Sequence, residues 1–318
     1  MAVYTEVSFE DLERFLQNYD IGAPLTFKGI AEGVENSNYY LQTDRGAFIL
    51  TLYEKRVNPG DLPFYLGLMQ HLARAGIVCP QPVPARDGAL SGTLNRRPCA
   101  IVTFLNGLSV RRPTPAHCAA AGAALARLHL AGGGFALTRA NALGPGGWET
   151  LGTACRPHAD GVEPGLAALI AGALADITAA WPRLPQGVIH ADLFPDNVLF
   201  MKEEVSGLID FYFACNDMFA YDLAIMLNSW CFETDGSYNI TKGQALAGAY
   251  QTVRPLSTDE IAAMPVLMQG ASLRFLLTRL FDWVNHDPQA LVSPKDPREY
   301  ARKLRFHRKV KHAREYGI

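Results

Sequence analysis

One short stretch of this 318-residue chain constrains its fold more than any other part of the sequence. Residues 190–200 read HADLFPDNVLF, and a second apolar run follows that ends at Asp210. Asp192 and Asp210 therefore both stand at the ends of apolar, strand-like runs, where a carboxylate without a partner is costly to bury. Taken singly, each of these residues would be interpreted as a turn former or a cap. Their combination with Asn197 indicates one polar site held by short strands.

The spacing of this motif is typical of enzymes that transfer a phosphoryl group. It has the H-x-D-x-x-x-x-N pattern of a kinase catalytic loop, followed by an apolar strand that ends in an acid. Such a reaction needs a carboxylate that orients the attacking hydroxyl and accepts its proton, a role that fits Asp192. It also needs Mg²⁺, which prefers hard oxygen ligands and keeps several waters. We therefore predict Asn197 and Asp210 as magnesium ligands and ATP as the phosphoryl donor.

Several neighbouring side chains are expected to support the structure only. His190 is predicted to pack and hydrogen-bond rather than to carry protons. Asp222 is predicted to start a helix or to brace it against the loop, and Asp196 is predicted to be exposed. Cys215 is interpreted, like the other cysteines, as a free thiol in the core, because the sequence contains no CxxC spacing.

The periodicity of apolar residues divides the chain into two unequal parts. The first part, 1–106, combines an N-terminal helix and a helix near 61–75 with β-like runs. Those runs are 25–30, 37–43, 47–53 and 98–105. The second part, 107–318, is mainly helical around short β-like runs at 188–190, 198–200 and 207–210. We predict an α+β, two-lobed, protein-kinase-like fold: a β-rich nucleotide-binding lobe with a hinge strand, and a helical lobe with the catalytic loop and substrate site.

Composition restricts the partners of the chain. Hydrophobic residues make up 49% and charged residues 19% of the sequence, and the formal net charge is −2. This balance indicates a globular protein without a general field for nucleic acid or anionic membranes. The N-terminus lacks the pattern of a signal peptide, and the Ala-rich segment 118–126 is too short to span a bilayer. We expect a cytoplasmic protein without a nucleic-acid or membrane partner, and the oligomeric state stays open.

Two functions of a different class remain compatible with these residues. A metal-dependent hydrolase could use His190, Asp192 and Asp210, although no further His or Asp cluster completes a catalytic metal site. A catalytically inactive nucleotide-binding module is the other alternative. Retention of all three oxygen-donor residues speaks against an inactive module.

Segments 188–200 and 208–215 resemble the aminoglycoside-phosphotransferase-like kinases, which belong to the protein-kinase-like superfamily. More narrowly, the chain is similar to the bacterial homoserine kinases of that superfamily. The segments that carry this narrower resemblance are 29–39, 49–56, 274–283, 295–300 and 304–308. The resemblance implies transfer of the γ-phosphoryl group of ATP to the hydroxyl of L-homoserine, in threonine biosynthesis. Kinases of choline, methylthioribose or aminoglycosides are the alternatives within the superfamily.

The resemblance also implies contacts with ATP. The loop 32–38 corresponds to the lid over the phosphates, and the strand 101–105 to the hinge whose backbone pairs with adenine. The residues so implied are Gly33, Asn36, Ser37, Asn38, Thr103 and Leu105. Without the resemblance, the same segments would be interpreted as an ordinary hairpin and a core strand.

One position departs from the usual pattern of these kinases. Their third strand carries a Lys for the phosphates, paired with a Glu on the following helix. Here the corresponding residue is Thr51, and the helix that begins near Leu62 contains no acid. Loss of both partners together avoids an unpaired buried charge. Lys28, Lys55 or an arginine are the candidates that would neutralise the phosphates.

A zwitterionic acceptor needs a cation for its carboxylate and an acceptor for its amine. The late helix offers four residues for this purpose. They are Arg274, Arg279, Asp282 and Trp283. Their spacing puts Arg274 and Asp282 on about the same helix face, and a plain salt-bridged helix is the alternative.

Overall fold

The computed structural model describes residues 5–30, 36–54, 57–286 and 293–318. The chain divides into two compact units. Unit 1 comprises Met1–Gly107 together with Gly207–Tyr212, and unit 2 comprises Leu108–Ser206 and Phe213–Ile318. Our sequence prediction divided the chain at 106/107. It did not foresee that the segment after the catalytic loop, which contains Asp210, belongs to unit 1.

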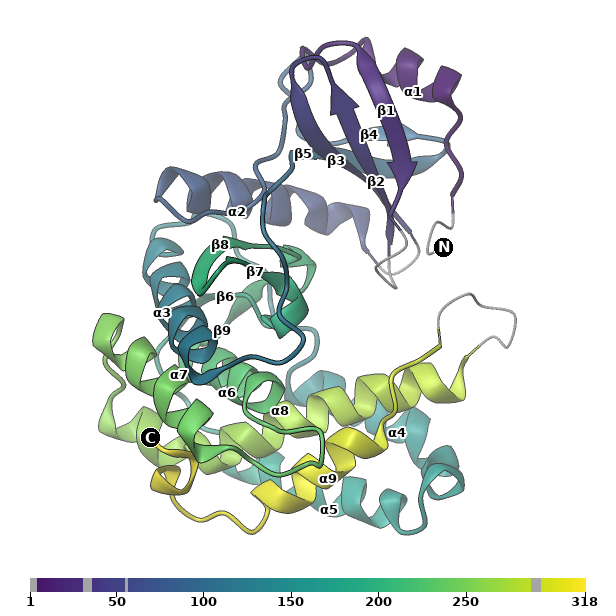
Figure 1. The fold of residues 1–318 in the computed structure, drawn as a ribbon. Coiled ribbons are helices and arrows are strands. Elements are labelled where there is room, and N and C mark those ends of the chain that lie inside the picture. The colour runs from purple at the N-terminus through teal and green to yellow at the C-terminus, as the bar shows by residue number, and fades with distance from the viewer. Residues whose placement is uncertain (1–4, 31–35, 55–56, 287–292) are drawn as a thin grey trace. The chain divides into compact units, whose positions relative to one another are not determined.

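Unit 1 is built on a five-stranded antiparallel sheet with the strand order β1-β2-β3-β5-β4 (Figure 1). The strands are β1 (Pro24–Gly29), β2 (Asn36–Thr43), β3 (Gly46–Tyr53), β4 (Gly92–Leu94) and β5 (Arg97–Thr103). The short turn between β2 and β3 lies where the sequence Asp44-Arg45-Gly46 predicts a hairpin. β4 was not predicted, because three residues carry too little periodicity to be recognised.

One face of this sheet forms a hydrophobic core with α1 (Phe9–Leu16). The helix starts at Ser8, whose Oγ accepts a hydrogen bond from the backbone N–H of Asp11 at 3.1 Å, as an N-cap does. Its buried residue Leu12 belongs to the same core cluster as Tyr39 of β2 and Leu50 of β3. Unit 1 also contains η1 (Pro59–Asp61) and α2 (Leu62–Arg74).

The opposite face of the sheet has a different character. Side chains alternate between the two faces of a strand, so the cross-strand pair Asn38–Thr51 faces away from α1. Tyr53 lies on the same face as Thr51, and its ring contacts that of Tyr212 at 5.2 Å between centroids. The segment Gly207–Tyr212 therefore packs on this polar face of the sheet.

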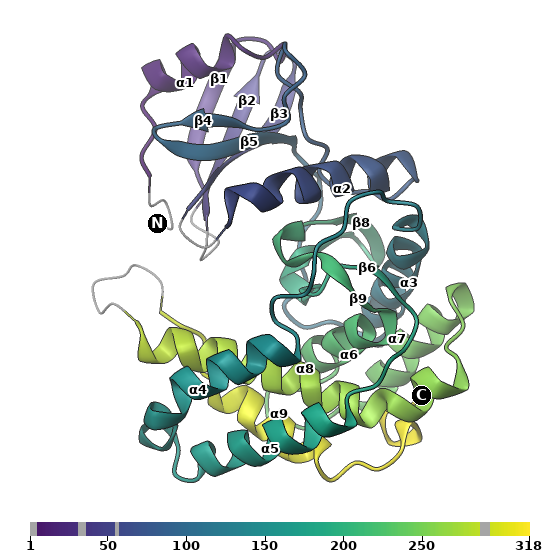
Figure 2. The ribbon, with the colours of Figure 1, turned by 180° about the vertical axis from the view of Figure 1, so that it is seen from behind.

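Unit 2 is a helical assembly around the long helix α8 (Thr258–Val284), which contacts α4, α5, α6 and α9 (Figure 2). The other helices are α3 (Pro115–Ala131), α4 (Pro145–Val162), α5 (Leu166–Ala180), α6 (Phe219–Trp230), α7 (Ile240–Val253) and α9 (Arg298–His307). Two-stranded sheets are formed by β6 (Gln186–Ile189) with β9 (Cys215–Met218), and by β7 (Val198–Met201) with β8 (Glu204–Leu208). The 3₁₀ turns of unit 2 are η2 (Pro195–Asn197) and η4 (Ala313–Tyr316), and a further one, η3 (Phe211–Phe213), begins in unit 1.

Two helices of unit 2 and the cysteines have compositions that bear on the sequence predictions. α4 was missed from the sequence because several glycines and Pro157 weaken its intrinsic helix propensity. α8 is the one described helix long and apolar enough to cross a membrane, and 61% of its most apolar window is buried inside the protein, as in a core helix. All six cysteines are buried free thiols, which confirms the prediction for them.

Candidate active site

The catalytic loop lies in unit 2 between β6 and β7. Asn197 closes it at the end of η2 and is only 9% exposed. Its Nδ2 donates hydrogen bonds to the backbone carbonyl of Asp192 at 2.7 Å and to the Asp192 carboxylate at 3.2 Å. One amide group thereby connects the end of the loop at Asn197 to its beginning at Asp192.

This arrangement leaves the amide oxygen of Asn197 directed away from Asp192. Within the described part of the chain, no group donates a hydrogen bond to this oxygen. An amide oxygen beside a carboxylate is the hard donor set that suits Mg²⁺. The residues of the loop therefore fit the metal that the sequence predicts.

The backbone of the loop is held by side chains from two helices of unit 2. Ala191 has a positive φ of 62°, a conformation that costs energy for a residue with a Cβ. Asp222 of α6 stabilises it, because its two carboxylate oxygens accept from the N–H groups of His190 at 2.8 Å and Ala191 at 2.9 Å. Arg274 of α8 donates to the carbonyl of Ala191. The predicted bracing role of Asp222 is confirmed.

Asp222 is itself part of a buried network that the sequence analysis did not identify. His129 of α3 approaches it with Nε2 at 3.0 Å from the carboxylate, and the other ring nitrogen lies 2.8 Å from the hydroxyl of Tyr250. Burial lowers the pKa of His129, so the ring is neutral at pH 7 and donates through Nε2. Burial alone would raise the pKa of Asp222, but hydrogen bonds from His129 and from the loop hold it below its usual value. A neutral histidine and a charged aspartate thus support the loop together.

Asp210 follows β8 in unit 1, and its backbone also adopts a positive φ, of 66°. The N–H of Leu208 donates to the carbonyl of Val78 at 2.9 Å, which fixes the segment within this unit. The negative charge of Asp210 contributes, after burial, to raising the pKa of Tyr53 and of Tyr212. Asp210 therefore lies near the polar face of the sheet. Since Asn197 belongs to unit 2, the joint metal site of Asn197 and Asp210 remains a prediction.

The residues implied for the phosphate lid are found mostly in β2. Gly33 lies outside the described residues. Asn36, Ser37 and Asn38 belong to the strand rather than to the loop before it, which corrects the predicted extent of that loop. The Oγ of Ser37 donates to the carboxylate of Glu54 at 2.7 Å, while Asn36 accepts from the Glu54 backbone at 3.4 Å. These two side chains are buried and stabilise the end of the β2–β3 hairpin, whereas Asn38 is partly exposed.

The predicted hinge residues stand at the end of β5. Thr103 is the last residue of the strand, and its backbone and side chain exchange hydrogen bonds with Gln81 at 2.9 Å. Leu105 lies just beyond the strand and is half-buried. A Cβ on Gly207 would come within 2.7 Å of the Leu105 side chain, so this glycine permits close packing of the two segments. Contact of Thr103 and Leu105 with adenine stays a prediction.

The four residues proposed for the acceptor do not share one role. Arg274 is 1% exposed, supports the catalytic loop and lies 4.5 Å from the ring centre of Phe275. Arg279 instead forms an ion pair with Glu299 of α9 at 2.6 Å. Trp283, near the end of α8, is 37% exposed. The alternative interpretation, a salt bridge, therefore applies to Arg279, although its partner lies on α9. Asp282 is partly exposed beside Trp283.

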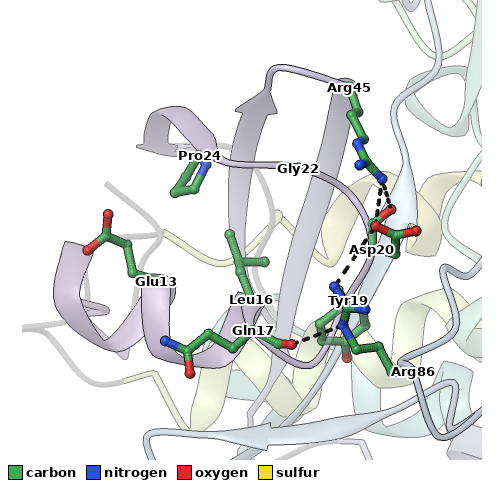
Figure 3. A pocket seen from close by; sticks show the side chains of 9 residues that line it. All are labelled: Glu13, Leu16, Gln17, Tyr19, Asp20, Gly22, Pro24, Arg45 and Arg86. Carbon is green, nitrogen blue, oxygen red and sulfur yellow. Dashed lines mark hydrogen bonds and ion pairs between the residues drawn. The ribbon is translucent and has the colours of Figure 1, made fainter.

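Unit 1 also has a surface depression of about 510 Å³ beside α1 (Figure 3). Arg45 and Arg86 both approach Asp20 there, at 2.5 and 3.9 Å. None of the residues predicted for the site lines this depression. Within the described ranges, no cluster of three or more His, Cys, Asp and Glu side chains is arranged as a metal site.

Comparison with known proteins extends this picture. A family model described as "Phosphotransferase enzyme family" matches residues 26–256. The chain is 62% identical to a homoserine kinase of Azorhizobium caulinodans, over 100% of this chain and 99% of that protein. It is 59% identical to a homoserine kinase of Mesorhizobium japonicum, over the full length of both.

Solved structures with low sequence identity share the fold. Amicoumacin kinase hAmiN, solved with AMP-PNP and Ca²⁺, has a TM-score of 0.70 and 16% identity over 94% of this chain and 92% of its own. A microcompartment-associated aminopropanol kinase has a TM-score of 0.67 and 16% identity over 98% and 99% of the two chains. The predicted kinase-like fold, with its antiparallel N-terminal sheet and helical C-terminal part, is confirmed.

Proposed function

Because this chain belongs to the homoserine kinases of the phosphotransferase enzyme family, we propose that it phosphorylates the hydroxyl of L-homoserine with ATP and that Asp192 is the catalytic base. The observation that carries the assignment of roles is the Asn197 amide. It donates to the Asp192 carboxylate at 3.2 Å and keeps its own oxygen for a metal ligand role. One asparagine thus orients the base and joins Asp210 in holding Mg²⁺.

The loop's own residues account for the chemistry. The carboxylate of Asp192 orients the homoserine hydroxyl and accepts its proton as the new bond from oxygen to the γ-phosphorus forms. The bond between the γ-phosphorus and the bridging oxygen breaks, and ADP leaves with that electron pair. When bound, Mg²⁺ neutralises charge on the phosphate oxygens. Asp222, His129 and Arg274 keep the loop in its conformation and need not touch the substrate.

The acceptor is a zwitterion, and its recognition is proposed for the exposed end of α8. Asp282 and Trp283 are partly exposed there, and Arg279 lies one turn earlier in its ion pair with Glu299. A carboxylate and a guanidinium are the groups that suit an amine and a carboxylate. The buried guanidinium of Arg274 is better suited to act through the carbonyl of Ala191. A cytoplasmic location, without a nucleic-acid or membrane partner, remains the expectation from composition.

The choice of acceptor is tested by a panel. We expect ADP release from MgATP to depend on L-homoserine and to stay at background with choline, methylthioribose and an aminoglycoside. A site that hydrogen-bonds particular groups of its substrate rejects analogues lacking them by about 10⁴-fold. Turnover with one of the other acceptors and none with homoserine would assign the chain a different substrate within the superfamily.

A further inference from the structure

The position at which related kinases carry a phosphate-binding lysine is filled by Thr51, and the side chains that hydrogen-bond around it are neutral. We propose that a hydrogen-bonded chain of four side chains, Tyr53, Tyr212, Thr51 and Asn38, takes the place of the lysine–glutamate pair and directs the Asn38 amide at the phosphates of ATP. This inference rests on the proposed function. It assigns a phosphate-binding role to a particular atom, Nδ2 of Asn38.

The chain of contacts lies wholly within unit 1. The hydroxyl of Tyr53 donates to that of Tyr212 at 3.2 Å, and the hydroxyl of Tyr212 is hydrogen-bonded to Thr51. Thr51 Oγ1 donates in turn to Oδ1 of Asn38 at 2.8 Å. α2 contributes the ring of Tyr65, which packs edge-on against Tyr212 at 5.8 Å between centroids. α2 thus meets this chain of contacts with an aromatic ring rather than with an acid.

The direction of these hydrogen bonds follows from the number of protons. Each hydroxyl has a single proton, so a hydroxyl that donates to one neighbour must accept from the next. The Thr51 proton is committed to Asn38. Oδ1 of Asn38 is the final acceptor, which fixes the orientation of the amide. The two N–H groups of Nδ2 then point away from Thr51, and no described residue accepts from them.

Burial distinguishes Asn38, at the end of the hydrogen-bonded chain, from the side chains in its interior. Thr51 is 2% and Tyr53 1% exposed, whereas Asn38 is partly exposed. The two unused donors are thus available to a ligand on the polar face of the sheet. Asp210 stands two residues before Tyr212, whose ring contacts that of Tyr53 on this same face at 5.2 Å between centroids. If Asp210 holds the magnesium of MgATP, the phosphates must come to this face as well.

A neutral donor is also the arrangement that the surroundings allow. The sequence of α2, LPFYLGLMQHLAR, contains no acid to pair with a lysine at position 51. An ammonium group there would be buried without a partner from α2. An amide oriented by a hydroxyl donates to phosphate without that cost, and a hydrogen bond to a charged group is the stronger kind.

The test measures the affinity for MgATP by calorimetry, which does not depend on the acceptor, and then the steady-state constants. Asn38→Asp keeps the shape but replaces both donors by a negative charge, so we expect Kd and KM for MgATP to rise about 10- to 100-fold. KM for homoserine should stay unchanged. Thr51→Ala and Tyr212→Phe remove hydrogen bonds that orient the Asn38 amide and should raise Kd and KM for MgATP about two- to tenfold. Thr51→Lys should not improve the enzyme.

Tyr40→Phe is the matched control, because Tyr40 lies on the same face of β2 and, within the described residues, its hydroxyl hydrogen-bonds only to Gln42, at 2.7 Å. It should behave as wild type. Unchanged affinity for MgATP in Asn38→Asp, or higher activity in Thr51→Lys, would overturn the inference. Tyr212→Phe covers the case in which Asn38→Asp does not fold, since a wild-type Kd in Tyr212→Phe also contradicts it. Loss of homoserine phosphorylation with intact MgATP binding would instead count against the proposed function.

Discussion

Asp192→Asn is expected to lower kcat by about 10²–10⁴ while leaving the binding of MgATP largely intact. The substitution preserves the shape of the side chain, and Asn197 can still donate to its oxygen. It removes the proton acceptor and the negative charge that orients the hydroxyl. Steady-state kinetics with L-homoserine, together with calorimetric binding of MgATP, measure the two effects separately.

Asp196→Asn provides the control from the same loop. Asp196 is exposed, as predicted, and its only ion pair is a loose one with Lys295 at 3.8 Å within the described residues. Since an exposed pair contributes about 0–1 kcal/mol, kcat should stay near wild type. A near-normal kcat in Asp192→Asn would contradict the assignment of Asp192 as the catalytic base.

Asp210→Ala is expected to abolish turnover through the metal. A carboxylate ligand to magnesium supplies charge and geometry that water cannot replace at the phosphates. Nucleotide should therefore lose the gain in affinity that magnesium gives to the wild type. Titration of ADP in the presence and absence of Mg²⁺ measures this difference.

Glu203→Ala serves as the comparison for Asp210→Ala, because it removes an exposed carboxylate from the turn between β7 and β8. Its magnesium dependence should match the wild type. If Asp210→Ala also gave the wild-type magnesium titration, Asp210 would not be a ligand.

The parts of the fold that were predictable from sequence are those with local signals. The cap at Ser8, the β2–β3 hairpin and the loop between β6 and β7 are each specified by residues within a few positions of one another. α4 lacks such a signal and depends on tertiary contacts, among them those of Trp148, which is completely buried. Weak helix propensity is commonly overridden in this way.

In the candidate site, too, the residues with a local sequence signal were predictable and those placed by tertiary contacts were not. Asp192 and Asn197 were predictable because their spacing is fixed by one loop. The support from His129 and Tyr250 was not, since the chain brings them to Asp222 from distant helices. In β2, the alternation of side chains decides that Ser37 is buried with Glu54 while Asn38 stays accessible. The resemblance to related kinases implied ATP contacts for Ser37 and Asn38 alike, because it does not show which of the two side chains is buried.

The central claim, phosphoryl transfer to a hydroxyl, is tested most directly by analysing both products of one reaction. Wild-type protein is incubated with MgATP and L-homoserine, and ³¹P NMR quantifies ADP, inorganic phosphate and phosphate ester. We expect one phosphate ester of homoserine for each ADP and almost no inorganic phosphate. ADP accompanied by an equal amount of inorganic phosphate, or no ADP at all, would contradict the account.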